Sequence, residues 1–210
     1  MSFILCIETG TSTCSVSLGQ KGRVIDVEES HDPENSHAKN TTVFIDSILK
    51  RQSLRVKDLG AVCVSKGPGS YTGLRIGVSV AKGICYGSGI PLLAVGSLQA
   101  MAHGAMEMIK DGKQQSIPSM LCPMIDARRM EVYSQLFSAN AEALTGVEAK
   151  VLDANSFSDY LTENKILFFG NGSEKAKEVI TLPNALFLDG FNPSARFMIH
   201  LAEKLYNQNK

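Results

Sequence analysis

The chain has 210 residues, which is enough for one large domain or two small lobes with a sizeable buried core. Hydrophobic residues make up 44% and charged residues 20%, a balance that excludes wholesale disorder. Twenty-one Lys and Arg balance 21 Asp and Glu, so the chain lacks the overall surplus of cations that a dedicated nucleic-acid binder carries. If it acts on nucleic acid, we therefore expect a partner to supply most of the positive field.

The cysteines and the apolar runs bear on the cellular compartment. Five cysteines, an odd number with no C-x-x-C spacing, favour buried reduced thiols over disulfides or a metal site. The first apolar run, 3–7, is too short for a signal peptide and no basic segment precedes it. Because no stretch approaches the ~20 apolar residues of a membrane span, we expect a cytoplasmic protein without membrane association.

In the first half, hydrophobic periodicity predicts three strands and then alternating helices and strands. The expected strands are 2–8, 13–18, 23–29, 61–65 and 91–95. The expected helices are 36–52, 72–86 and 97–109, with Ser36 and Ser97 as the caps of the first and third.

The second half repeats this order of elements without visible sequence identity to the first. Its expected strands are 120–126, 130–137, 147–152, 166–169 and 185–188. Its expected helices are 156–161, 173–180 and 193–206. The pattern βββαβαβα, written twice, predicts an α/β protein with two lobes, 1–110 and 111–210, joined through the polar stretch 110–119. The final helix is a candidate to pack back on the first lobe.

Each lobe is then expected to hold a mixed five-stranded sheet with helices on its faces. Two such lobes are similar to the actin-like architecture of sugar kinases and Hsp70-type ATPases. A likeness of fold by itself implies no activity.

A glycine-rich segment, KGPGSYTGLRIG at 66–77, follows a predicted buried strand and opens a helix. Glycines there allow close backbone approach, and a helix start presents free N–H groups, so the segment could cradle a phosphate. The spacing fits neither a Walker A loop nor a dinucleotide fingerprint. The alternative is a tight turn capped by Ser70 or Thr72. The candidate phosphate-loop residues in this segment are Gly67, Gly69, Ser70, Thr72 and Arg75.

The helix after this segment carries small residues every four positions. Gly73, Gly77 and Ala81 share one face, and Gly83 and Gly87 repeat the spacing nearby. Glycine inside a helix costs ~1 kcal/mol relative to alanine, so we expect a close helix contact to offset it. That helix could be 36–52 of the same chain or could belong to a partner. The candidate contact residues bordering the stripe or on helix 36–52 are Phe44, Ile45, Ile48, Leu49, Ile76, Val80 and Ile84.

Together with its flanks, this segment resembles the TsaB family, also called YeaZ, which belongs to the bacterial machinery that makes threonylcarbamoyladenosine in tRNA. The resemblance covers nearly the whole chain. The segments that carry it are 8–12 (ETGTS), 67–77, 81–83 (AKG), 89–91 (GIP), 125–129 (IDARR), 131–133 (EVY) and the closing helix. The resemblance also implies the actin-like fold.

The resemblance implies a non-catalytic subunit that forms a heterodimer with a catalytic paralog, TsaD. It also implies that an ATPase, TsaE, docks on this pair. It implies that tRNA is reached indirectly through this complex, and that the isolated chain can form a homodimer through the same helices of the first lobe. No cofactor of its own is expected, although a nucleotide could sit at the subunit interface. The relationship to the catalytic paralog also links the family to the glycoproteases.

Two departures in the sequence argue against independent catalysis. The catalytic paralogs carry His-x-x-x-His after the strand that corresponds to 91–95, and here those positions are Ser97 and Met101, which are poor ligands for Zn²⁺ or Fe. Actin-like ATPases usually place Asp at the end of the first strand, where this chain has Glu8, followed by Thr9. Glu8 and Thr9 complete the candidate phosphate loop. The rival functions are an independent actin-fold ATPase or phosphotransferase and, further off, a metallopeptidase.

Two turns in the second half are further candidates. Asp126-Ala127-Arg128-Arg129 ends a strand, and it is either a hairpin in which an arginine pairs with Asp126 or a contact for a partner or tRNA phosphate. Asn171-Gly172-Ser173 is either a plain turn with a helix cap or the adenosine-side loop of an actin-like lobe.

Overall fold

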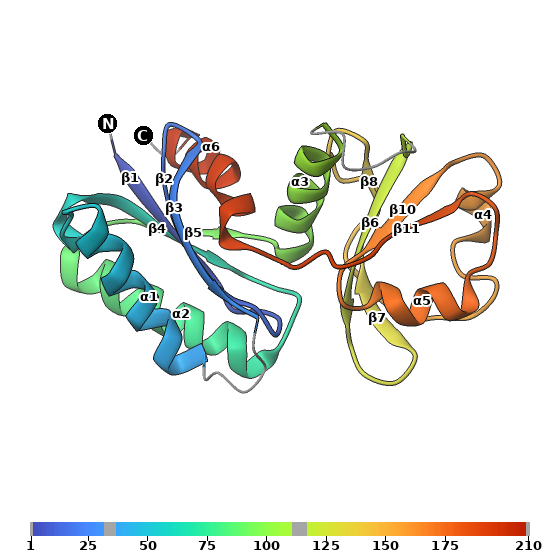
Figure 1. The fold of residues 1–210 in the computed structure, drawn as a ribbon, viewed down its shortest axis with the longest axis horizontal. Coiled ribbons are helices and arrows are strands. Elements are labelled where there is room, and N and C mark those ends of the chain that lie inside the picture. Colours follow the sequence, from blue (N-terminus) through green and yellow to red (C-terminus); the bar gives the residue numbers. More distant parts are fainter. Residues whose placement is uncertain (1, 32–36, 111–116, 209–210) are drawn as a thin grey trace. The chain divides into compact units, whose positions relative to one another are not determined.

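The computed structural model describes residues 2–31, 37–110 and 117–208 (Figure 1). Its internal contacts divide the chain into two compact units, Met1–Ala100 with Pro193–Lys210, and Met101–Asn192. The division therefore falls inside a helix, about ten residues before the polar stretch, and the last segment of the chain belongs to the first unit. Among the described residues, no helix combines the length and the apolar character needed to cross a membrane.

The first unit is built on a mixed five-stranded sheet in the order β3-β2-β1-β4-β5. Its strands are β1 (Phe3–Glu8), β2 (Cys14–Gln20), β3 (Arg23–Ser30), β4 (Leu59–Ser65) and β5 (Leu92–Val95). The first three form the expected antiparallel meander, and β1 pairs in parallel with β4, which pairs in parallel with β5. Parallel pairing requires crossover connections, and the predicted helices supply them.

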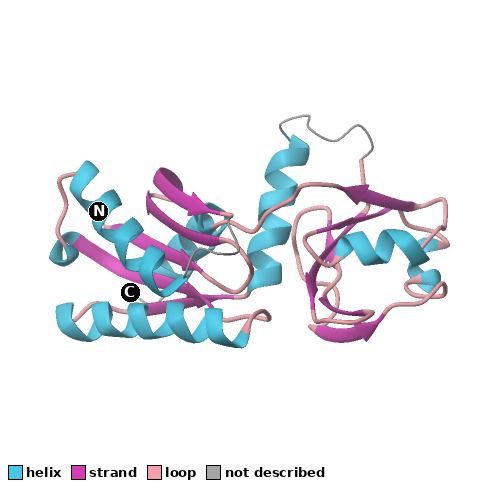
Figure 2. Cartoon of the chain, turned by 60° about the horizontal axis from the view of Figure 1, so that its bottom comes forward, coloured by secondary structure: helices cyan, strands magenta, loops and turns pink. Residues whose placement is uncertain are grey.

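Helices cover both faces of this sheet (Figures 1 and 2). On one face lie α1 (His37–Arg51) and α2 (Tyr71–Ser88), and on the other lies α6 (Ile199–Gln208). Short 3₁₀ turns, η1 (Val56–Asp58) and η2 (Ala195–Met198), precede β4 and α6. Because side chains alternate along a strand, Leu5 and Ile7 of β1 pack toward α1 and α2, while the equally buried Cys6 points to the opposite face.

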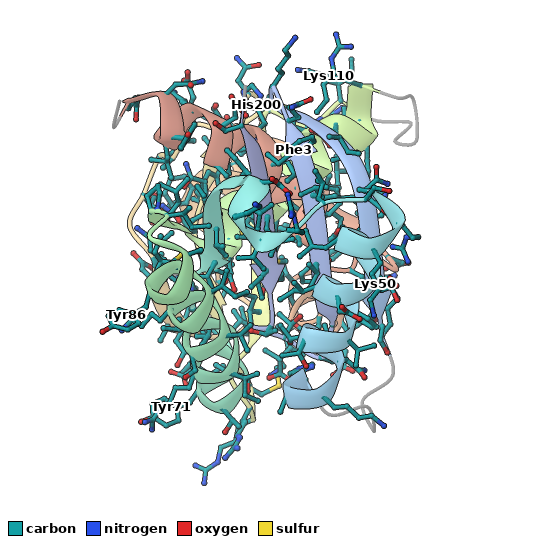
Figure 3. The ribbon with its side chains drawn as sticks, turned by 90° about the vertical axis from the view of Figure 1, so that its left-hand side faces the viewer. Phe3, Lys50, Tyr71, Tyr86, Lys110 and His200 are labelled. Carbon is teal, nitrogen blue, oxygen red and sulfur yellow. The ribbon has the colours of Figure 1, made fainter. Side chains whose placement is uncertain are left out.

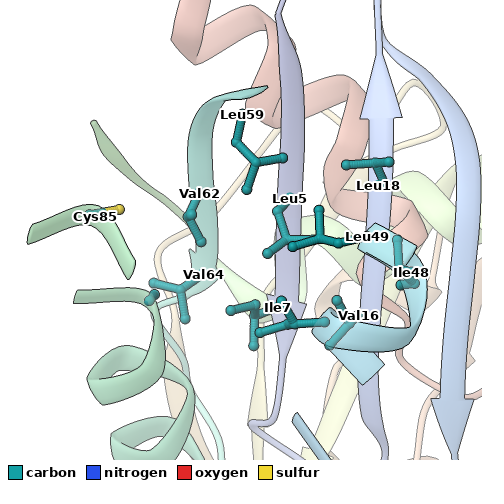
Figure 4. Close-up of a cluster of buried hydrophobic side chains, with 12 residues drawn as sticks. Leu5, Ile7, Val16, Leu18, Ile48, Leu49, Leu59, Val62, Val64 and Cys85 are labelled. Carbon is teal, nitrogen blue, oxygen red and sulfur yellow. The ribbon is translucent and has the colours of Figure 1, made fainter. Parts of the chain in front are cut away.

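The core under α1 and α2 is entirely apolar (Figure 4). It gathers side chains from three central strands and two helices: Leu5, Ile7, Val16, Leu18, Ile45, Ile48, Leu49, Leu59, Val62, Val64, Ala81 and Cys85. The burial of these side chains stabilises the unit and fixes how α2 lies on the sheet.

The second unit holds a sheet in the order β11-β10-β6-β7-β9, with a further short strand, β8, that also pairs with β6. Its strands are β6 (Met120–Asp126), β7 (Glu131–Ser134), β8 (Phe137–Ser138), β9 (Glu148–Val151), β10 (Ile166–Phe169) and β11 (Ala185–Leu188). Its helices are α4 (Ser158–Leu161) and α5 (Ser173–Val179), and α3 (Ser97–Lys110) contains the division between the units.

The expected single strand 130–137 is wrong, because the chain forms β7 and β8 instead. Between them, the backbone of Leu136 leaves the ladder: its carbonyl accepts from Leu144 N at 2.9 Å and its N–H donates to Thr145 Oγ1 at 3.1 Å. Those bonds to the 144–145 segment replace the pairing with β6, so the strand is interrupted.

Helix starts were predicted less well than helix positions. Ser97 is not a cap: α3 begins at this residue, Ala100 N donates to Gly96 O at 3.0 Å, and Ser97 Oγ is buried without a hydrogen-bond partner. The expected final helix, 193–206, begins instead as the 3₁₀ turn η2, capped by Ser194. The expected cap Ser36 lies outside the described residues.

The last segment is fastened to the first unit by polar contacts with β2 and β3. Ala195 N donates to Ser15 Oγ at 2.8 Å, and Ser194 Oγ donates to Glu29 Oε1. Ile199 lies directly over Gly19, where a methyl group would overlap its side chain. Glycine at position 19 therefore allows the start of α6 to reach the sheet.

Candidate functional site

The end of β1 turns its carboxylate inward. Glu8 is 1% exposed, and its Oε1 accepts hydrogen bonds from Gly10 N at 2.6 Å and Ser65 Oγ at 3.0 Å. Burial raises the pKa of Glu8 above its ordinary value of 4.5, and these hydrogen bonds offset only part of that effect. The carboxyl group thus holds the loop after β1 through its hydrogen bond with Gly10 N.

That loop packs directly against the glycine-rich segment. Thr9 Oγ1 donates to Gly73 O at 2.8 Å, and Ser70 N donates to Gly10 O at 2.6 Å. A methyl group at Gly69 would overlap Gly10 O, and one at Gly73 would overlap Thr9 O. The glycines at 69 and 73 therefore bring two stretches of backbone into contact.

The expected phosphate loop is assembled, but its central donors are already used. Ser70 is the N-cap of α2 and accepts from Gly73 N at 3.2 Å, as one of the two predicted caps. Thr72 and Arg75 belong to a different surface, because both line an apolar groove on the exposed side of α2. Arg75 Nη1 donates to Tyr71 OH at 2.9 Å. Nucleotide binding at this loop stays a prediction.

The glycine stripe on α2 does not form a surface. Gly73, Gly77 and Ala81 are buried against the sheet, and a methyl group at Gly77 would overlap Thr9 Oγ1. The assignment of these three residues to a partner interface is therefore wrong. The close contact that offsets the helical glycines is made by the loop after β1 and by β4 of the same chain.

The same correction holds for α1. Ile45, Ile48 and Leu49 are at most 7% exposed and belong to the apolar core of the first unit. Three of the remaining candidates border that core as partly buried side chains: Phe44, Val80 and Ile84. The fourth, Ile76, is also partly buried but is not part of this border.

A second row of small residues on α2 is exposed. Gly83 follows Ala81 by two residues, which is about 200° around the helix. A methyl group at Gly83 or Gly87 would meet nothing within 4 Å. Residues three or four positions apart share one face of a helix. Counting back from Gly87, this spacing defines an outer face of α2 that consists of Thr72, Ile76, Ser79, Gly83 and Gly87.

Two tyrosines flank the outer face of α2. Tyr71 is 73% exposed and Tyr86 is 94% exposed, and both project outward from the helix (Figure 3). The apolar groove at the N-terminal end of this face is lined by Ala38, Tyr71, Thr72, Arg75, Ile76, Ser79 and Val80. The sequence could have indicated this second face, because Gly83 and Gly87 are out of step by two residues with the four-residue repeat of Gly73, Gly77 and Ala81.

The positions that correspond to paired histidines in the catalytic paralogs are buried in this chain. Ser97 starts α3 and Met101 lies one turn later, each 1% exposed. Over residues 2–31, 37–110 and 117–208, no group of three or more His, Cys, Asp or Glu side chains is placed to hold a metal ion.

In the second unit, Asp126 is held by a lysine. Its Oδ1 accepts from Lys175 Nζ at 2.6 Å and from Arg128 N at 2.7 Å, so the expected pairing with an arginine side chain is wrong. Burial raises the pKa of Asp126, but these bonds outweigh it and hold the pKa below the usual 3.8. Asn171 Oδ1 accepts from Asp126 N at 3.1 Å, so this candidate residue braces the same turn, and Gly172 is the N-cap of α5.

Comparisons with known proteins give relatives over most of the chain. The family model described as TsaD, tRNA N6-adenosine threonylcarbamoyltransferase, matches residues 31–182. The chain is 28% identical to the tRNA threonylcarbamoyladenosine biosynthesis protein TsaB of Haemophilus influenzae, over 98% of this chain and 86% of that protein. It is 32% identical to TsaB of Bacillus subtilis, over 84% of this chain and 74% of that protein.

Solved structures match the fold. YeaZ from Pseudomonas aeruginosa has a TM-score of 0.79 at 22% identity, covering 100% of this chain and 94% of that chain. The Lmo2764 protein from Listeria monocytogenes has a TM-score of 0.53 at 10% identity, covering 99% of both chains. The α/β fold of the actin-like type, predicted from the duplicated pattern, is confirmed by these matches and by the two mixed sheets.

Proposed function

The chain belongs to the TsaB (YeaZ) family of tRNA threonylcarbamoyladenosine biosynthesis proteins, and from this we propose that it acts there as a non-catalytic subunit. The chain forms a heterodimer with the catalytic paralog TsaD, and the ATPase TsaE docks on this pair. The chain supports the transfer reaction without carrying it out.

The observation that carries this proposal is the contrast between a site without metal ligands and an exposed helix face. At the site where the paralogs carry paired histidines, this chain has Ser97 and Met101, both buried and neither a good metal ligand. The outer face of α2, by contrast, carries exposed small residues at Ser79, Gly83 and Gly87 and is flanked by two tyrosines. Aromatic residues are enriched at protein interfaces.

We place the contact with the catalytic paralog on the outer face of α2 together with the exposed side of α1. Ser79, Gly83 and Gly87 recur every four residues, which lets a second helix approach closely. Val43 of α1 is 50% exposed and adds apolar surface. The buried residues Gly77 and Ala81 cannot test this interface, because changing them disturbs the chain's own packing.

The decisive variant is Gly83→Glu. A Cβ at this position meets nothing within 4 Å, so the fold is expected to be unchanged, but a charged side chain on the outer face of α2 should block a facing helix. We expect co-purification with the catalytic paralog to be lost, and tRNA modification in a mixture of the three reconstituted proteins to fall with it. The thermal midpoint of the isolated variant should not fall below that of the wild type, because glutamate has a better helix propensity than glycine.

Gly146→Glu is the matched control, because a Cβ at Gly146 also meets nothing within 4 Å and this residue lies in the other unit. It should retain both binding and activity. Full co-purification by Gly83→Glu would contradict the interface. Steady ATP turnover by the purified chain alone would contradict the non-catalytic assignment and favour the phosphotransferase alternative.

A further inference from the structure

The turn between β6 and β7 has an unusual backbone. Arg128 and Arg129 have φ angles of 70° and 44°, two successive left-handed conformations that side chains other than Gly, Asn and Asp disfavour. A hairpin of this kind is normally built with Asn-Gly or Asp-Gly. The arginines at these positions are therefore not explained by the needs of the turn.

A network behind the turn holds it in place. Lys175 Nζ donates to Asp126 Oδ1 at 2.6 Å, to Arg129 O at 2.6 Å and to Glu131 O at 3.1 Å. The Lys175 side chain is only 16% exposed, and the Arg128 N–H closes the ring on Asp126. The Asp126 carboxylate is thus neutralised by Lys175, and the backbone carbonyls of Arg129 and Glu131 are held by the same ammonium group.

The two guanidinium groups stay outside this network. Both residues are exposed, and within the described part of the chain neither side chain has a hydrogen bond or an ion pair. Arg51, by comparison, bonds both Asp26 and Glu28. Both arginines line a surface hollow, together with Ala127, Met130, Glu131 and Val151.

We propose that the Arg128–Arg129 turn binds backbone phosphates of the tRNA, an inference that rests on the proposed function. Guanidinium groups are suited to phosphate, and two neighbouring ones match the repeated phosphates of a nucleic acid. Because the chain has no net charge, such a contact contributes position and register more than overall affinity. The braced turn presents the two cations in a fixed place.

The test is the double variant Arg128→Asn with Arg129→Asn. Asparagine tolerates the left-handed conformation, so the charges are removed while the turn is kept. Unmodified tRNA is titrated by fluorescence anisotropy, at several salt concentrations, into the complex of this chain with its catalytic and ATPase subunits. We expect weaker binding and a plot of log K against log salt that is shallower by about two units, one for each lost phosphate contact.

Lys21→Asn with Arg23→Gln is the control, because it removes two exposed cations from the hairpin between β2 and β3, where Lys21 is also left-handed. It should leave the salt dependence at the wild-type value. Equal slopes for the wild type and the Arg128/Arg129 variant, or an equal loss in the control, would overturn the proposal. Unchanged tRNA binding with loss of the catalytic subunit would also overturn it, in favour of a protein contact.

The two proposals fail separately. A wild-type chain that does not assemble with the paralog contradicts the proposed function. The same titration on the full chain alone then decides whether the arginine turn contacts tRNA.

Discussion

Glu8 ends β1 with a buried carboxyl group that bonds Gly10 N and Ser65 Oγ, both from its own unit. At the corresponding place an actin-like ATPase uses Asp to organise Mg²⁺ through water. Here the longer side chain has an internal task, because it satisfies a backbone donor of the loop that packs on α2. The Glu8 carboxyl group thus holds this loop through its hydrogen bonds and is itself buried from solvent.

Glu8→Gln should change how stability depends on pH. Since burial raises the pKa of Glu8, the folded chain retains a proton that the unfolded chain loses above about pH 4.5. Wild-type stability therefore falls as pH rises from there through the higher folded-state pKa. Gln keeps the acceptor oxygen and cannot ionise, so urea unfolding at a series of pH values should show the variant gaining on the wild type as pH rises. Parallel profiles would contradict this.

At the scale of the element, α2 carries two rows of small residues with opposite roles. Gly73, Gly77 and Ala81 let the helix lie against the loop after β1, and Ser70 and Gly89 end it at either side. On the outer face of α2, Ser79, Gly83 and Gly87 have the same four-residue repeat, and a methyl group at either glycine would meet nothing within 4 Å. One helix thus combines an internal seam with a surface suited to another helix.

Matched alanine substitutions should separate these roles. In Gly77→Ala the methyl group overlaps Thr9 Oγ1, and overpacking costs about 1–3 kcal/mol, offset in part by the better helix propensity of alanine. In Gly83→Ala nothing is displaced, so a gain of up to about 1 kcal/mol is expected. Urea unfolding measures both. A stabilised Gly77→Ala would show that the seam has room to spare.

At the scale of the whole molecule, each unit encloses its own apolar core, and the cysteines lie in these interiors. All five thiols are free and buried, as the odd count and spacing predicted. Burial raises the pKa of Cys6 and of Cys122 well above the ordinary value. A raised pKa keeps the reactive thiolate form of these two cysteines scarce at neutral pH.

Thiol titration should therefore report the integrity of both units. In native buffer at neutral pH we expect almost no fast reaction with a disulfide reagent, and all five thiols should react after denaturation. Rapid labelling of even one cysteine in the native protein would contradict the buried placement. Mass mapping of the labelled residue would then show which unit opens.

The order of the elements could be predicted because it depends on local pattern. The continuous apolar runs that became β1, β4, β6 and β10 gave their strands within two residues. The interruption at Leu136 could not be predicted, because it arises from hydrogen bonds to Leu144 and Thr145 that compete with the sheet. For the candidate interface, the sequence could not show that the Gly73, Gly77 and Ala81 face of α2 is covered by the chain's own sheet and loop.

The sequence alone determined the duplicated α/β pattern and the family. Both could be predicted because periodicity and motif spacing are properties of residues close together in the chain. The tertiary structure decided which side of α2 is covered and that the last segment joins the first unit. It also decided that Lys175, rather than an arginine, pairs with Asp126. Each of these depends on contacts between residues far apart in the chain. A stripe of glycines on a helix can pack against a strand of the same chain or against a helix of another protein, and only the tertiary fold decides between them.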